Sequence, residues 1–250
     1  MSALFAELDY QATPLGALAL RRRRDLATGD DIYEIKLNDE FLMSSKFTVS
    51  ERALATIALG ELPRPGLRIV VGGLGLGYTA AAALENPHVG SMLVVEALRP
   101  VIDWHEAGLL PLGKMLAADG RCRFVHGDFF AMAASPGEGF DPAAPGSLFD
   151  AILLDIDHSP SEVLTPSNAA LYAPEGLRTL ARHLTPDGIF ALWSNNREDA
   201  GFTARLAAVF GEARAEAVVF DNPIQGRQAH QCVYLARNIA AGAASPAQRA

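Results

Sequence analysis

The sequence predicts an α/β fold built on a doubly wound, mostly parallel sheet of seven strands with a closing antiparallel hairpin. A small N-terminal β-hairpin region is expected to precede it. Three observations carry this prediction. Short apolar runs alternate with helical stretches from residue 67 onward, a glycine-rich loop follows the first run, and half of the 250 residues are hydrophobic, enough for one large core.

Residues 1–48 are predicted to form the N-terminal β-hairpin region. Two strand-like runs, LGALALRRRRDL and DIYEIKLNDEFLMSS, are separated by the turn signal ATGDD. A helix is expected to follow, because Ser50 is a suitable N-cap and apolar residues recur at helical spacing up to Gly60. This helix would link the hairpin region to the large sheet.

Residues 49–238 are predicted to form the doubly wound domain. Their apolar runs alternate with helical stretches, the pattern of a mostly parallel sheet covered on both faces. These runs are LRIVV, SMLVVE, CRFVHGD, DAILLDID and GIFALWS. The last runs, AEAVVFD and QCVYLAR, are expected to form the closing hairpin, and residues 239–250 have the composition of a loose tail.

The stretch VVGGLGLGYT, residues 70–79, places four glycines directly behind a β-branched run. Glycine adopts positive φ readily and lets the backbone approach a ligand closely. In a sheet of this kind, ligands bind at the carboxyl ends of the strands. The helix that Thr79 opens would offer amides and a dipole to a negative group or to the polar tail of a nucleoside. The loop therefore predicts a ligand site.

Acidic residues close the next two runs. Glu96 lies roughly twenty residues after the loop, the offset at which a carboxylate accepts both hydroxyls of a ribose. Asp128 follows the third run, where it can accept from an exocyclic amine, beside Phe129, whose ring can cover a flat ligand. An adenine fits this pair. The alternative is that Asp128 only caps the next helix.

The fourth run ends in Asp155, Asp157 and His158. In an extended segment the two carboxylates share one face, where they would repel each other and shift their pKa values. Such crowding indicates catalytic groups, with His158 as a candidate base that Asp157 orients. The alternative for His158 is a turn residue that binds nothing.

Three further residues are candidates for binding a small-molecule acceptor. Trp193 and Asn195 end the fifth run, and Tyr172 lies in the segment NAALYAPEG. Core packing is an equally good explanation for Trp193, because its large ring buries well.

Composition argues against several classes of partner. The formal net charge of −8 disfavours nucleic acid and anionic membranes. The RRRR run at 21–24 is therefore expected on a solvated edge strand or at an oligomer contact.

Cys122 and Cys232 lack the spacing of zinc ligands, so no metal is expected. The sequence shows neither a leader pattern nor a long apolar stretch, which predicts a cytoplasmic protein.

The order of glycine loop, VVE, HGD and LLD over residues 67–195 resembles that of class I S-adenosylmethionine-dependent transferases. The segments YEIKL and MSSKFTVSERALATIAL precede the loop as the N-terminal strands and lead-in helix do in the spermidine-synthase-like branch. The resemblance implies a Rossmann-like fold and S-adenosylmethionine as the cofactor. It also makes the hairpin region a candidate contact for a homodimer.

The same resemblance implies a role for each of the residues that end the strands. The implied contacts are Gly73, Gly75 and Gly77 around the methionine part of the cofactor, Glu96 on the ribose, Asp128 on the adenine amine, and Asp155 near the sulfonium.

Two departures from the branch bear on the reaction. Its aminopropyltransferases carry an acidic residue in the glycine loop that holds the ammonium of decarboxylated S-adenosylmethionine, and this chain has Leu76 at the matching position. Their D-[ST]-[ST]-D-P motif reads DIDHSP here, so the base is rearranged or lost. Methyl transfer to a small amine or hydroxyl acceptor is therefore the favoured function. A divergent polyamine aminopropyltransferase and a non-catalytic, nucleoside-binding regulatory protein remain as alternatives.

Overall fold

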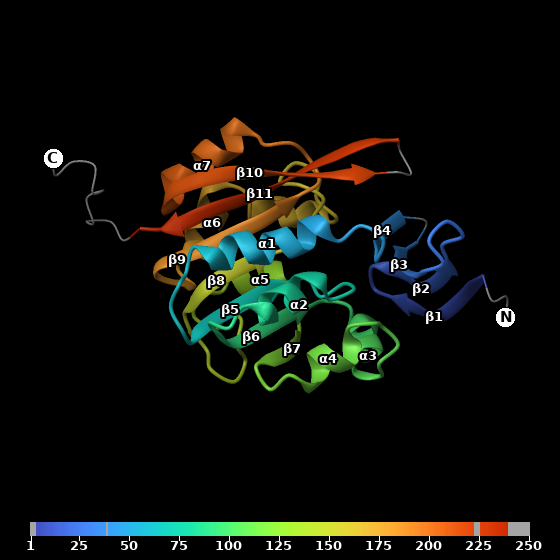
Figure 1. The fold of residues 1–250 in the computed structure, drawn as a ribbon. Coiled ribbons are helices and arrows are strands. Elements are labelled where there is room, and N and C mark those ends of the chain that lie inside the picture. Colours follow the sequence, from blue (N-terminus) through green and yellow to red (C-terminus); the bar gives the residue numbers. More distant parts are fainter. Residues whose placement is uncertain (1–3, 39, 223–225, 240–250) are drawn as a thin grey trace.

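The computed structural model of the protein describes residues 4–38, 40–222 and 226–239. They form a four-stranded antiparallel sheet and a seven-stranded, mostly parallel sheet with helices (Figure 1). The predicted α/β class and the closing hairpin are confirmed. The predicted tail lies outside the described residues except for Ile239.

The N-terminal sheet is larger than the hairpin predicted from the sequence. Its four strands, in the order β1-β2-β3-β4, are β1 (Phe5–Thr13), β2 (Gly16–Arg24), β3 (Asp31–Leu37) and β4 (Glu40–Ser44). Strand β1 was not predicted, although polar and apolar side chains alternate over residues 7–13; Ala6 is its only buried residue.

The arginine run lies on an inner strand. Strand β2 pairs with β1 on one side and with β3 on the other, so the prediction of an edge strand is wrong. Carboxylates on these flanking strands pair with the guanidinium groups: Arg21 lies 3.3 Å from Glu7, and Arg23 lies 2.6 Å from Glu34. Cross-strand pairs of opposite charge stabilise a sheet. The positive charge is thus balanced inside its own sheet.

The large sheet has the strand order β10-β11-β9-β8-β5-β6-β7. Its strands are β5 (Leu67–Gly72), β6 (Val89–Glu96), β7 (Cys122–His126), β8 (Phe149–Leu154), β9 (Leu184–Ser194), β10 (Gly211–Asn222) and β11 (Arg227–Asn238). Strands β5 to β9 are parallel to one another, whereas β11 runs antiparallel to both β9 and β10. The strand order reverses between β5 and β8, so a ligand crevice is expected at their carboxyl ends.

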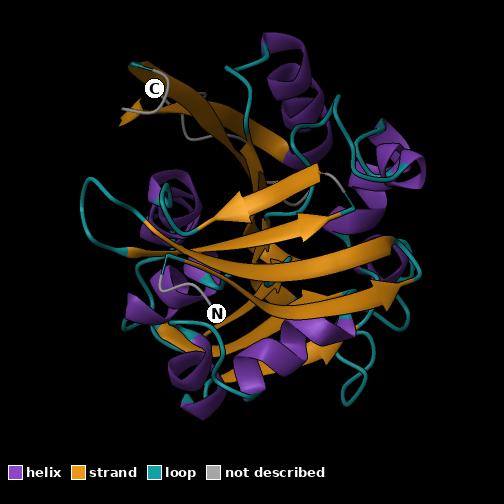
Figure 2. Cartoon of the chain, turned by 90° about the vertical axis from the view of Figure 1, so that its right-hand side faces the viewer, coloured by secondary structure: helices purple, strands orange, loops and turns teal. Residues whose placement is uncertain are grey.

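Helices cover both faces of the large sheet, as Figure 2 shows from the side. One face carries α1 (Val49–Gly60), α2 (Tyr78–Glu85), α3 (Arg99–Glu106) and α4 (Gly113–Ala118). The other carries α5 (Phe129–Ala133), α6 (Pro174–Ala181) and α7 (Ala200–Phe210), and a 3₁₀ helix η1 (Pro166–Ala170) precedes α6. Neighbouring residues of a strand enter opposite cores: Val71 faces α1 to α4, whereas Val70 faces α5 to α7.

The N-terminal sheet shares a hydrophobic core with the first face of the large sheet. Leu18, Leu20 and Ile35 belong to the same buried cluster as residues of α1 and α2. The buried Trp104 of α3 donates its Nε1–H to Asp9 Oδ2 on β1 at 2.6 Å. The sheet is therefore fixed beside the first face by apolar contacts and by the partly buried hydrogen bond from Trp104 to Asp9.

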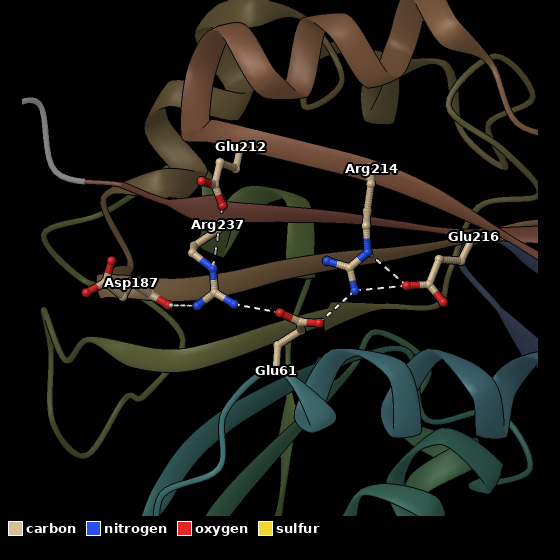
Figure 3. A network of polar contacts seen from close by, with 6 residues as sticks. All are labelled: Glu61, Asp187, Glu212, Arg214, Glu216 and Arg237. Atoms are coloured by element: carbon tan, nitrogen blue, oxygen red, sulfur yellow. Dashed lines mark hydrogen bonds and ion pairs between the residues drawn. The ribbon is translucent and has the colours of Figure 1, made fainter. Parts of the chain in front are cut away.

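Polar contacts fix the last turn of α1 to the closing hairpin (Figure 3). Glu61, which follows that turn, accepts from Arg214 of β10 and from Arg237 of β11, each at 2.7 Å. Arg237 pairs with Ile189 in the middle of β9, and its Nη1 donates to the main-chain oxygen of Asp187 at 3.3 Å, in the first half of that strand. The first turn of α1 is thereby directed toward the carboxyl ends of the strands.

The first turn of α1 differs from the sequence prediction in its cap. The N-cap position is Thr48, and Ser50 lies inside the helix, where its hydroxyl donates to Glu51 Oε2 at 2.8 Å.

Among the described residues, no helix combines the length and the apolar character needed to cross a membrane.

Candidate functional site

The glycine loop joins β5 to α2 at the point where the strand order reverses. Gly73 and Gly77 have φ values of +93° and +90°, which L side chains rarely adopt. A Cβ on Gly73 would meet the main-chain oxygen of Asp155, and one on Gly77 would lie 2.6 Å from Leu116. The glycines therefore let the loop lie against the end of β8 on one side and against α4 on the other.

The side chain of Leu76 does not face the open side of this loop. It is 1% exposed and belongs to the buried cluster shared by α1 to α4. A cofactor tail lying on the loop would contact the backbone of Leu76 and not its side chain. A Cβ on the half-buried Gly75 would meet the sulfur of Met43 from the N-terminal sheet.

Glu96 connects the end of β6 to the glycine loop. Its Oε2 accepts from the amide of Leu74 at 3.1 Å, and its Oε1 accepts from the amide of Leu98 at 2.8 Å. Burial raises the pKa of this carboxyl group, and the backbone hydrogen bonds oppose that shift. The amides of Gly75 and Ala97 also contribute to this effect, so the carboxylate is held by the glycine loop and by the segment after β6.

Asp128 serves as a helix cap, the alternative that the sequence left open. Its Oδ1 accepts from the amides of Phe130 at 2.8 Å and of Ala131 at 3.3 Å, at the start of α5. Both bonds end on Oδ1, so Oδ2 is not used by the cap. The residue is exposed and remains able to bind an amine through Oδ2.

Phe129 is a core residue in this structure. It is 2% exposed, it stacks on Phe140 with ring centroids 4.9 Å apart, and its ring fills the space beside Gly72. Its faces are therefore occupied by the protein itself. The half-buried Phe130 is the aromatic side chain next to Asp128 that retains exposed surface.

Asp155 follows the last residue of β8 and faces α1 and α2. Its Oδ2 accepts from the Thr79 hydroxyl at 2.6 Å. Burial raises the pKa of Asp155 to about 6, and the Thr79 hydrogen bond opposes that rise. Among the described residues, no lysine or arginine forms an ion pair with this carboxylate.

Glu51 is a second acidic group beside Asp155, and sequence reasoning missed it. Burial and the charge of Asp155 raise the pKa of Glu51 to about 7. The Thr79 oxygen lies 3.2 Å from the main-chain oxygen of Glu51, so α1 and α2 meet here. A glutamate in the first turn of a helix is ordinarily explained by the helix dipole. Nothing in the sequence relates it to Asp155, about a hundred positions away.

Asp157 faces the opposite side of the sheet from Asp155. The buried carboxylate accepts from the Leu164 amide at 2.8 Å, the Asn168 side chain at 2.9 Å and the Tyr172 hydroxyl at 2.7 Å. The expected shared face does not form, because β8 ends at Leu154 and strand alternation stops there. Asp157 and the buried Tyr172 thus hold the segment after β8 in place.

His158 and Asn195 lie together at the surface of the site. The amide of Asn195 donates to the main-chain oxygen of His158 at 2.7 Å, which joins the end of β9 to the segment after β8. A depression of about 350 Å³ opens beside them, between β4 and that segment. It is lined by Glu40, Phe41, His158, Glu162, Val163 and Leu164.

Trp193 packs on the same face of the sheet as α1. It is half-buried against the cluster that contains Ala191 and Leu153. Its Nε1–H is buried and has no acceptor among the described residues. A buried donor without a partner is unfavourable, so this atom is available for a bound molecule.

Comparison with known proteins identifies the fold. No protein-family model and no curated protein matches the chain. Among solved structures, spermidine synthase from Thermotoga maritima aligns with a TM-score of 0.69 at 18% identity, over 93% of this chain and 72% of that one. A spermidine synthase in complex with the transition-state analogue AdoDATO gives 0.70 at 18% identity, over 93% of this chain and 73% of that one.

A methyltransferase shares the fold over less of the chain. Human methyltransferase-like protein 13 in complex with SAH aligns with a TM-score of 0.57 at 17% identity, over 79% of this chain and 86% of that one. The fold class is therefore the Rossmann-like one that such transferases adopt. Within it, the chain has the architecture of the spermidine synthases, so the resemblance seen in the sequence is confirmed for the fold.

A double-mutant cycle tests the anchoring role of Asp157. We expect Asp157→Ala to lower the free energy of unfolding by about 3 kcal/mol, because it leaves buried donors unpaired, and Tyr172→Phe to lower it by about 1 kcal/mol. Urea unfolding measures both. The two losses should be less than additive, since the residues share one hydrogen bond. Full additivity would contradict this assignment.

The raised pKa of Glu51 predicts how stability depends on pH. The ionised group is disfavoured in the folded state, so destabilisation begins as pH rises above the ordinary value of 4.5 and is complete above about 7. We expect Glu51→Gln to raise the free energy of unfolding by about 2 kcal/mol at pH 8 and little at pH 4. The exposed Glu85→Gln is the control and should change it by less than about 0.5 kcal/mol throughout. A difference independent of pH would refute the pairing of Glu51 with Asp155.

Proposed function

We propose that the chain is an S-adenosylmethionine-dependent transferase that methylates an amine. The observation that carries this proposal is the pair Glu51 and Asp155, two half-buried carboxylates beside the glycine loop whose pKa values are raised. Neither forms an ion pair with a cationic side chain among the described residues. Buried carboxylates without a partner favour a cationic ligand. A protonated amine matches this requirement better than a neutral hydroxyl does.

The residues at the strand ends fit the cofactor. Glu96 would accept from the ribose, Asp128 retains Oδ2 for an exocyclic amine, and the loop glycines carry no side chains of their own at the start of α2. When bound, S-adenosylmethionine would supply a sulfonium, an activated leaving group for methyl transfer.

The chain itself would bind and deprotonate the acceptor. Asp155 and Glu51 would hold the amine, and a carboxyl group with a pKa near 6 or 7 is suited to exchange a proton at neutral pH. The Trp193 Nε1–H would donate to a polar group of the acceptor. The depression beside His158 would take the outer part of the molecule. Asp157 would act only as a positioning residue that fixes the segment carrying His158.

Aminopropyl transfer is the second candidate. The match to spermidine synthases extends over the N-terminal sheet, and Glu51 with Asp155 can hold the ammonium of decarboxylated S-adenosylmethionine as well as that of an acceptor. Methyl transfer remains the first candidate, because residues 72–77 contain no acidic side chain that would anchor such an ammonium in the loop.

The nucleoside released in the reaction distinguishes the two. The protein is incubated with an amine mixture and either S-adenosylmethionine or its decarboxylated form, and products are separated by chromatography with mass detection. Methyl transfer releases S-adenosylhomocysteine, whereas aminopropyl transfer releases 5′-methylthioadenosine. We expect S-adenosylhomocysteine and a methylated amine. Binding of either donor without turnover would support a regulatory protein instead.

Glu96 provides a test of cofactor binding that does not depend on the acceptor. We expect Glu96→Gln to weaken the binding of S-adenosylhomocysteine by about tenfold or more, because the charge-assisted bonds to the ribose are lost. Isothermal titration calorimetry measures the affinity, and circular dichroism checks the fold. The exposed Glu106→Gln of α3 is the matched control. An unchanged affinity in Glu96→Gln would remove Glu96 from the site.

A further inference from the structure

Met43 of β4 reaches across from the N-terminal sheet to the glycine loop. The amide of Leu76 donates to the Met43 sulfur at 3.0 Å. The sulfur and methyl group also occupy the space where a side chain on Gly75 would lie, since a Cβ there would be 3.3 Å from the Met43 Cε and in collision with the sulfur. Met43 therefore covers Gly75 and the Leu76 amide.

The amide that Met43 occupies is suited to a stronger acceptor. Leu76 lies just before the start of α2, where backbone amides and the helix dipole favour negative charge. A thioether sulfur is a weak acceptor, whereas a carboxylate forms charge-assisted bonds about twice as strong as neutral ones. The methionine side chain is also unbranched and adapts its conformation readily. A carboxylate can therefore displace it from this amide.

An ammonium group lacks this ability, because it has no acceptor to offer the amide. A ligand tail that ends in an ammonium alone would have to displace Met43 and leave the Leu76 amide without a partner. A ligand without a tail would leave Met43 in place. The same contact thus responds differently to three kinds of nucleoside.

We propose that Met43 is a specificity-determining residue that closes the subsite for the amino-acid tail of the cofactor until a tail carboxylate replaces its sulfur on the Leu76 amide. This inference rests on the proposed function. The preference for S-adenosylmethionine over its decarboxylated form would then depend on Met43 and on the Leu76 amide. It would not depend on the Leu76 side chain, which is buried.

Two nucleosides that differ only in the tail test the proposal. S-adenosylhomocysteine carries the amino-acid tail with its carboxylate, and 5′-methylthioadenosine lacks it. We expect Met43→Ala to tighten the binding of S-adenosylhomocysteine by about tenfold in calorimetry, because the tail no longer has to displace a side chain, a change of about 1.4 kcal/mol. The affinity for 5′-methylthioadenosine should change less than about twofold. Met115→Ala, at an exposed methionine of α4, is the matched control and should alter neither.

A second measurement uses the unaltered side chain. Methionine labelled with ¹³C in its methyl group gives one NMR signal for each methionine, and the Met43 signal is assigned by its absence from Met43→Leu. We expect S-adenosylhomocysteine to shift the Met43 signal and 5′-methylthioadenosine to leave it in place. Equal affinity changes for both nucleosides, or a Met43 signal unmoved by S-adenosylhomocysteine, would overturn the inference alone. If the unmodified protein binds neither nucleoside, the proposed function fails and the inference fails with it.

Discussion

The close approach of the glycine loop to the end of β8 is the constraint on which the rest of the site depends. The Asp155 amide donates to the Gly72 oxygen at 2.8 Å, and Gly73 lies so near the Asp155 oxygen that no side chain fits between them. This contact brings the ends of β5 and β8 together at the point where the strand order reverses. The buried His105 of α3 also donates to the Gly75 oxygen at 2.9 Å, so the loop is held by contacts with both β8 and α3.

Charge is distributed unevenly around this constraint. Several carboxylates elsewhere pair with arginines, such as Glu61 with Arg214 and Arg237 and Glu7 with Arg21. At the carboxyl ends of β5 and β8, in contrast, Asp155 has a hydroxyl as its partner and Glu51 has another carboxylate nearby. Burying such groups lowers stability unless a cation joins them. The unfavourable arrangement is understandable if a cationic ligand completes the site.

The N-terminal sheet contributes to the site as well as to the core. Its apolar residues join the same cluster as α1 and α2, and Asp9 binds Trp104. This attachment is what brings Met43 onto the glycine loop and places Glu40 and Phe41 opposite His158. A transferase built from the large sheet alone would lack one wall of the depression and the cover over Gly75.

The sequence by itself determined the layer structure and the strand ends. Apolar runs of strand length, each followed by a helical stretch, leave few ways to bury their surface other than a covered parallel sheet. Because ligands bind at the carboxyl ends of such strands, Glu96, Asp128 and Asp155 were predicted as site residues from position alone. The arginine run was misplaced on an edge strand, because no strand was assigned to residues 5–13 and the pairing of β1 with β2 is visible only in the folded chain.

Only the tertiary structure decided which of these side chains face one another. Strand alternation ended at Leu154, so Asp157 turned to Tyr172 while Asp155 turned to Thr79. Leu76 is buried and Met43 covers Gly75, which the loop sequence does not specify. Glu51 and Met43 are distant in sequence from the strand ends of the large sheet. The sequence therefore did not identify them as site residues. The physical reason is that periodicity and capping rules act over a few residues, whereas contacts between α1, β4 and the large sheet arise from packing of whole elements.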